Sequence, residues 1–150
     1  MECTAYEHFV GIDVSETSIR QTRTFLNSNL AGEKLHLHCA DFLKYPLKAS
    51  SFDAIVMGEM LEHVENPKDY LKKIASVAKK NAYICVTTCI NAPSIDHIYL
   101  FKNLGELEDI FSQSGIRIKE QCILPYVDKT LEECIEQWLT INVGYVLEKQ

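Results

Sequence analysis

Short apolar runs alternate with amphipathic stretches along most of the chain. Runs rich in Val, Ile, Leu and Phe have the length and composition of strands, and apolar residues in the stretches between them recur at helical spacing. The expected strands cover residues 8–14, 35–40, 52–57, 82–88, 116–124 and 140–147. The expected helices begin near Ser15, Asn66, Leu104 and Thr130.

Polar residues mark several of the helix ends. Ser15 is a suitable N-cap for the first helix, and Asn66 precedes a proline at the first helical position of the second. Gly115 is a suitable stop for the third. The run from Thr130 to Glu133 fits a capping box for the fourth.

The order of elements is β-α-β-β-α-β-α-β-α-β, which predicts an α/β fold. We expect one domain over residues 1–150, with a mostly parallel sheet and helices on both faces. Because one short helix is all that separates the last two strands, the carboxyl-terminal strand is expected to run antiparallel at the sheet.

Charge and composition narrow the classes of partner. Fifteen Lys and Arg against 21 Asp and Glu give a net charge of −6, which is unsuited to general nucleic-acid binding. No apolar run reaches membrane-spanning length, and residues 1–4 do not begin a secretory signal. The six cysteines include no CxxC and are interpreted as small buried side chains in a reducing cytoplasm. We therefore expect a cytoplasmic protein with a small-molecule ligand.

Chemistry-bearing residues follow the first three strands, at the carboxyl ends where open α/β sheets bind ligands. Asp13 follows the first strand and could accept hydrogen bonds from both hydroxyls of a ribose. Asp41 and Phe42 follow the second, as a carboxylate for an adenine amino group and a ring to cover the base. Either aspartate by itself is more simply a turn residue, but the pair favours a nucleoside site.

Four stretches give the chain a family resemblance. They are Val10–Ser15, Cys39–Phe42 running on to Ser51–Val56, Glu59–Pro67, and Ser114–Ile116. Over nearly its whole length the chain resembles class I S-adenosylmethionine-dependent methyltransferases, which have a Rossmann-like sheet. The Glu59–Pro67 stretch is the most specific and resembles O-methyltransferases of ubiquinone biosynthesis and related small-molecule enzymes.

The resemblance implies methyl transfer from S-adenosylmethionine to a small-molecule acceptor, at oxygen. It implies that Asp13, with Val14 beside it, holds the cofactor ribose and that Asp41 and Phe42 hold the adenine. It also implies that the stretch Met57-Gly58-Glu59 lines the sulfonium end of the cofactor. We expect no nucleic-acid or membrane partner.

The chain departs from the family in its glycines. The six are Gly11, Gly32, Gly58, Gly105, Gly115 and Gly144. No two are close enough for the glycine-rich loop that wraps the methionine part of the cofactor, and residues 1–7 resemble the tail of the helix after that loop. The expectation is a domain truncated at its amino end by about thirty residues, with an incomplete cofactor site.

That departure predicts an open slot between the strand at residues 9–13 and the strand at residues 53–57. The two strands could pair directly, a second chain could fill the slot, or the amino-terminal strands could leave the sheet. We expect a homo-oligomer, because unpaired hydrophobic edges invite pairing with another copy.

Glu59, Glu62 and His63 stand at i, i+3 and i+4, and His97 follows the next strand. Carboxylates and imidazoles converging there predict an Mg²⁺ or Mn²⁺ site. His63 and His97 are also the candidates for a catalytic base. The simpler interpretation is that Glu62 or His63 merely caps and packs the turn.

Two other functions stay open at this point. The chain could be a non-catalytic or partner-dependent remnant of a methyltransferase fold, which the absent glycine loop favours. It could also be an NAD-binding oxidoreductase domain, because Asp13 suits the ribose of NAD equally well. The Glu59–Pro67 stretch and the carboxyl-terminal strand pair favour the methyltransferase.

Overall fold

The computed structural model describes residues 7–27 and 34–150, and its contacts divide the chain into two compact units, residues 1–46 and 47–150. A single domain over residues 1–150 stays a prediction.

The first unit contains two parallel strands and one helix: β1 (Phe9–Asp13), α1 (Glu16–Asn27) and β2 (Leu35–Cys39). Asp13 is aligned with Cys39, so the carboxyl ends of both strands lie together. The Ser15 hydroxyl accepts a hydrogen bond from the Ser18 amide at 3.2 Å, which confirms the predicted N-cap of α1. Gly11 allows close strand packing, because a Cβ there would lie 2.6 Å from Leu37 Cδ2.

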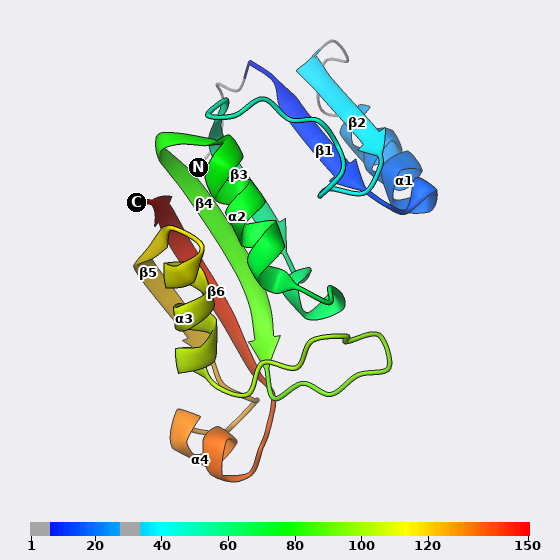
Figure 1. Cartoon of the computed structure of the whole chain (residues 1–150). Helices are drawn as coiled ribbons and strands as arrows, with labels where there is room; N and C mark the ends of the chain where they lie inside the picture. The colour runs from blue at the N-terminus through cyan, green and yellow to red at the C-terminus, as the bar shows by residue number, and fades with distance from the viewer. Residues whose placement is uncertain (1–6, 28–33) are drawn as a thin grey trace. The chain divides into compact units, whose positions relative to one another are not determined.

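The second unit contains a four-stranded mixed sheet in the order β3-β4-β6-β5 (Figure 1). Its elements in chain order are β3 (Phe52–Gly58), η2 (Leu61–His63), α2 (Pro67–Val77), β4 (Ala78–Ile90), α3 (Leu104–Gln113), β5 (Ile116–Leu124), α4 (Leu131–Glu136) and β6 (Ile141–Lys149). β3 runs parallel to β4, whereas β6 runs antiparallel to both β4 and β5. The fold is thus α/β with a mixed sheet, and the last strand runs antiparallel to its neighbours.

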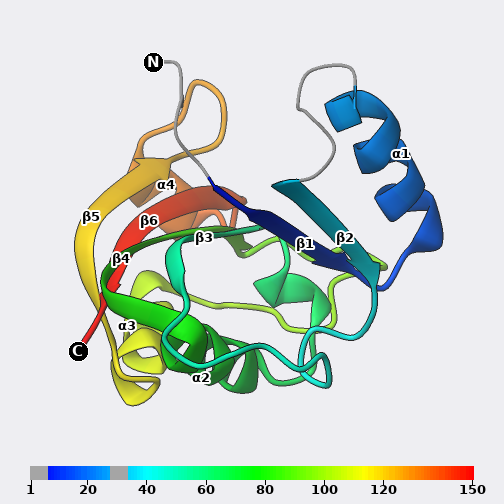
Figure 2. The same cartoon turned by 90° about the horizontal axis from the view of Figure 1, so that it is seen from above.

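Helices α2 and α3 cover the same face of this sheet, as the view from above shows (Figure 2). Leu71 and Ile74 of α2 and Leu107 of α3 are fully buried. Phe111 of α3 packs edge-on against Tyr145 of β6, with ring centroids 5.0 Å apart at 71°. This apolar layer is the core that holds the strand ends in place.

The local signals agree with the structure except at two places. Thr130 and Glu133 form both hydrogen bonds of the predicted capping box. The side chain of Asn66 does not cap α2, because its amide donates to the Asp69 carboxylate at 2.7 Å instead. β4 also begins earlier than predicted, directly after α2, because Ala78 adopts an extended backbone at the helix end.

The interpretation of the cysteines as buried side chains is correct in part. Cys89 and Cys134 are buried, whereas Cys39 and Cys122 are exposed; all four are free thiols. Cys122 lies on β5, which is the edge strand next to β6 in the four-stranded sheet. The middle of β5 is therefore exposed. Cys3 lies outside the described residues.

In residues 7–27 and 34–150 no helix combines the length and apolarity needed to cross a bilayer. A cytoplasmic location stays a prediction.

The predicted slot between β1 and β3 stays a prediction, because the two strands belong to different units. In the described part of the chain β1 is hydrogen-bonded to β2 and β3 to β4, in separate sheets. On β1 and on β3, the backbone N–H and C=O groups along one edge therefore take no part in these two ladders. The helix tail expected at residues 1–7 lies outside the described residues, apart from Glu7.

Truncating Leu107 tests the core of the second unit. Because Leu107 is fully buried, we expect Leu107→Ala to lower the free energy of unfolding by about 2–5 kcal/mol. Urea unfolding followed by circular dichroism measures the loss. The exposed neighbour on the same helix supplies the control, since Glu108→Ala should change stability by about 0.5 kcal/mol or less. Equal effects of the two changes would contradict this core.

Among the described residues β3 has one hydrogen-bonded neighbour, β4, and we expect self-association through its other edge. Val56 is 79% exposed on this strand, and light scattering should give a mass above that of one chain. Val56→Lys should shift the protein toward monomer, because a charged edge residue opposes strand addition. Val127→Lys is the matched control, since Val127 is 76% exposed but lies outside the strands. A monodisperse monomer at all concentrations would refute the prediction.

Candidate functional site

Asp13 lies at the carboxyl end of β1 and opens the turn into α1. Its Oδ1 accepts a hydrogen bond from the Ser15 amide at 2.7 Å, and its carbonyl accepts one from the Ala40 amide at 2.9 Å. The side chain is exposed. Asp13 is therefore both a turn residue and a carboxylate that a ligand can reach.

Asp41 follows the neighbouring strand end and is held within its own turn. Its Oδ1 accepts a hydrogen bond from the Leu43 amide at 2.9 Å, and its Oδ2 lies 3.1 Å from Lys44 Nζ. The Lys44 hydrogen bond, more than the Leu43 amide, lowers the pKa of the Asp41 carboxyl below its usual range. The group thus stays charged and can accept further hydrogen bonds, because a carboxylate offers about four lone-pair sites.

The structure therefore brings Asp13 and Asp41 to adjacent strand ends in the first unit, as predicted. Phe42, half-buried, follows Asp41 directly. Val14 is 74% exposed beside Asp13. The roles of these residues toward a nucleoside stay predictions.

The end of β3 in the second unit places Met57 in the core and Gly58 and Glu59 at the surface. Glu59 has a φ of +46°, and its amide donates to the Thr87 carbonyl of β4 at 3.0 Å. A non-glycine residue in this region costs about 1–3 kcal/mol, and such strain gathers at functional sites. The backbone thus turns sharply where a ligand is expected.

Glu62 is buried, and it ties three segments together. Its carboxylate accepts a hydrogen bond from the Thr88 hydroxyl of β4 at 2.6 Å. Its carbonyl accepts from the amides of Ile98 and Tyr99 at 2.8 and 2.9 Å. The chain forms one 3-10 turn here, Leu61–His63, in place of the α-helical turn that the spacing from Glu59 predicts.

His63 and His97 lie side by side, with ring centroids 4.9 Å apart at 84°. His63 Nδ1 lies 2.8 Å from the Asp96 carbonyl oxygen, and His97 Nδ1 lies 2.6 Å from that of Ala92. Since a carbonyl can only accept, each Nδ1 carries the proton and donates. With Nδ1 as the donor, Nε2 is the ring nitrogen that can carry a lone pair.

Two groups of three metal-ligating side chains share His97. One consists of Glu62, Cys89 and His97, and the other of His63, Asp96 and His97; within each, one ligand atom per residue lies within 4.8 Å of the others. Glu59 belongs to neither group. The four-residue Mg²⁺ or Mn²⁺ site stays a prediction. Cys89 and Asp96 escaped the sequence reasoning, although Asp96 adjoins His97.

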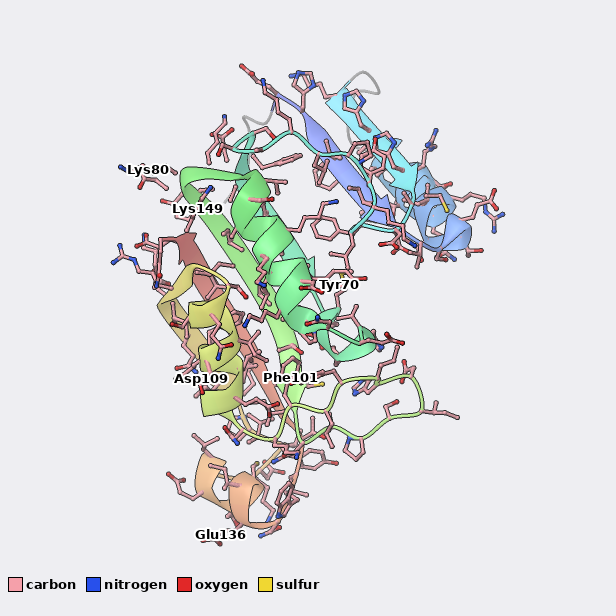
Figure 3. The ribbon with its side chains drawn as sticks, viewed as in Figure 1. Tyr70, Lys80, Phe101, Asp109, Glu136 and Lys149 are labelled. Atoms are coloured by element: carbon pink, nitrogen blue, oxygen red, sulfur yellow. The ribbon has the colours of Figure 1, made fainter. Side chains whose placement is uncertain are left out.

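The loop of residues 91–103 that carries Asp96 and His97 is anchored at both ends. The Asn91 amide donates to the Phe101 carbonyl at 2.9 Å, and Glu106 of α3 accepts from the Tyr99 hydroxyl, also at 2.9 Å. Phe101 is fully buried where this loop returns toward α3 (Figure 3). Asn91 has a φ of +52°, and its buried Oδ1 is without a hydrogen-bond partner. The loop is therefore held, with local strain at its start.

Comparison with known proteins identifies the family. A family model described as a methyltransferase domain matches residues 1–86, which is more than half of the chain. An uncharacterized protein of Haemophilus influenzae is 25% identical over 125 residues, covering 73% of this chain and 49% of that protein. The chain thus spans about half the length of this relative.

Solved structures show the same fold at low sequence identity. An S-adenosylmethionine-dependent methyltransferase from Mesorhizobium loti superposes with a TM-score of 0.67 at 15% identity, over 95% of this chain and 81% of that one. The cyclase SpnF superposes with a TM-score of 0.73 at 12% identity, over 95% of this chain and 66% of that one. Because a cyclase and a methyltransferase share it, the fold alone does not fix the reaction.

The Cys89 thiol is expected to resist alkylation at neutral pH. Burial, followed by the nearby Glu62 and Glu59 charges, raises its pKa to about 11. The thiolate is the reactive form, and at pH 8 it amounts to about 0.1% of a thiol with that pKa. Mass spectrometry after iodoacetamide treatment should show the exposed Cys39 and Cys122 modified first. Labelling of Cys89 should rise only as the pH approaches 11. If Cys89 were labelled at pH 8 as fast as Cys122, the prediction would be wrong.

Proposed function

The chain belongs to the methyltransferase-domain family, and we propose that it serves methyl transfer from S-adenosylmethionine to an oxygen atom of a small-molecule acceptor. Dependence on S-adenosylmethionine follows from the family. The observation that supports the acceptor chemistry is the pair of imidazoles, His63 and His97, each with its Nδ1 proton fixed on a carbonyl. The activity of the whole protein is part of the proposal.

The nucleoside half of the cofactor fits residues of the first unit. Exposed Asp13 offers a carboxylate to the ribose hydroxyls, and Asp41 offers one to the adenine amino group beside the Phe42 ring. Met57, Gly58 and Glu59 are proposed to line the sulfonium end. No two of the six glycines stand within three residues of one another, so the chain lacks a glycine-rich loop for the methionine half.

The cofactor supplies a methyl group on a positively charged sulfur. The residues of this chain have to orient the acceptor and remove its proton. Nε2 of His97 or His63 would take the hydroxyl proton of the acceptor as its oxygen receives the methyl group that the cofactor would supply, the cofactor leaving as a neutral thioether. The Asp96 carboxylate, 3.9 Å from His63 Nδ1, would stabilise the resulting imidazolium.

A partner-dependent binding domain is the second candidate. The spacing of the glycines favours it, because backbone amides for the methionine carboxylate and amine would have to come from elsewhere. Both candidates share the nucleoside-binding residues Asp13 and Asp41. They differ in whether the 150 residues alone transfer a methyl group.

Titration calorimetry of the 150-residue chain with S-adenosylmethionine tests the proposal. We expect weak binding, because the nucleoside half is held while the methionine half is not. Asp13→Asn should weaken it about tenfold further, since hydrogen bonds to a charged group contribute about 1.5–3 kcal/mol and an amide retains part of that.

The control is Asp109→Asn, an exposed aspartate on α3 (Figure 3) that should bind as the unaltered chain does. Tight binding by the unaltered chain would show that another segment replaces the glycine loop. Binding that is indifferent to Asp13→Asn would remove Asp13 from the proposed site.

A further inference from the structure

We propose that His63, Asp96 and His97 bind one divalent transition-metal ion, with zinc as the ion that suits the donors. Two imidazoles and a carboxylate are a recurrent zinc ligand set, and three protein ligands leave a position open for water or substrate. The site differs from the predicted Mg²⁺ or Mn²⁺ site in both its ion and its carboxylate.

The three donors are already close to ligand geometry. Their ligand atoms lie within 4.8 Å of one another, whereas tetrahedral zinc ligands at about 2.1 Å stand about 3.4 Å apart. The side chains would therefore have to draw closer together around an ion. All three side chains are exposed or half-buried, so an ion can reach them from solvent.

The second ring nitrogen of each histidine has the partner that a metal ligand needs. Metal-binding histidines usually donate their other N–H to a carbonyl or carboxylate, which fixes the tautomer and turns the free nitrogen toward the ion. His63 Nδ1 donates to the Asp96 carbonyl and His97 Nδ1 to the Ala92 carbonyl. This tautomer leaves Nε2 as the nitrogen of each imidazole that can bind an ion.

The backbone around the site is also fixed before any ion binds. The Glu62 carbonyl holds the amides of Ile98 and Tyr99, which places the loop against η2. The Ser94 hydroxyl donates to Asp96 Oδ1, which orients that carboxylate. The loop and the Asp96 side chain therefore lose little conformational entropy when an ion binds, which favours a higher affinity for the ion.

The group of Glu62, Cys89 and His97 is the weaker candidate. The Glu62 carboxylate is 1% exposed and accepts from Thr88, and Cys89 is 6% exposed. An ion would have to shed its water to enter that interior and break the Glu62–Thr88 hydrogen bond. Asp96 is exposed, and its ligation requires no burial of charge.

Ion binding stands independently of methyl transfer, whereas its use in catalysis rests on the proposed function. A zinc ion on these residues would polarise the acceptor hydroxyl bound at its open position and lower the pKa of that hydroxyl. His63 and His97 would then act as ligands in place of proton acceptors.

Cobalt spectroscopy on the full chain tests the proposal without any activity assay. Protein freed of metal by EDTA and dialysis is titrated with Co²⁺, whose visible absorption reports its ligands. We expect one Co²⁺ per chain, visible bands of a nitrogen and oxygen site, and displacement by one equivalent of Zn²⁺. His63→Ala, His97→Ala and Asp96→Asn should each weaken binding by on the order of 10–100-fold, with circular dichroism confirming that they fold.

Three further variants make the result decisive. His36→Ala and Asp128→Asn, exposed residues outside both groups, should leave binding unchanged. Cys89→Ser should also bind normally. A near-ultraviolet thiolate-to-cobalt band that Cys89→Ser removes, with Asp96→Asn silent, would move the ion to the other group and overturn the proposal. Binding that is non-stoichiometric, or equally weakened by His36→Ala, would show adventitious binding and overturn it too.

Discussion

The candidate site of the second unit depends on the burial of Glu62. Its carbonyl holds two amides of the 91–103 loop and its carboxylate holds the Thr88 hydroxyl of β4. A buried carboxylate that loses its hydrogen bonds is costly, so these three segments are held as one arrangement. His63 and His97 face each other because the residues beside them, Glu62 and Ile98, are joined through the backbone.

The sequence predicts the elements of this fold well where local signals and burial agree. The Thr130 capping box and the Ser15 N-cap form as expected, because each is satisfied within four residues. Asn66 fails as a cap because Asp69, equally local, competes for its side chain. The early start of β4 could not be foreseen, since residues 79–81 are polar and lie where the ladder with β3 shifts its register, between the pairs Phe52–Ala78 and Ala54–Tyr83.

The sequence predicted which residue types stand at the strand ends better than it predicted which side chains lie together. The strand-end pattern predicted that Asp13 and Asp41 lie at neighbouring carboxyl ends, because β1 and β2 are parallel strands that share one edge; their roles stay predictions. The helical spacing of Glu59, Glu62 and His63 predicted an α-helical turn that does not form, since a three-residue 3-10 turn and a positive φ at Glu59 break that periodicity. Asp96 joins His63 only through the path of a loop, and no sequence periodicity encodes that path.

The position of β6 has a consequence for the order in which the chain can assemble. β6 is the last strand in sequence, yet it lies between β4 and β5 and is the hydrogen-bonded neighbour of β5 in the sheet. During synthesis, therefore, β5 has no ladder to join until residues 141–149 have left the ribosome. Nascent chains that stop short of this strand carry two separate unfinished edges. The sheet can therefore close only when β6 emerges, and the risk of misassembly is concentrated in the interval between the synthesis of β5 and that of β6.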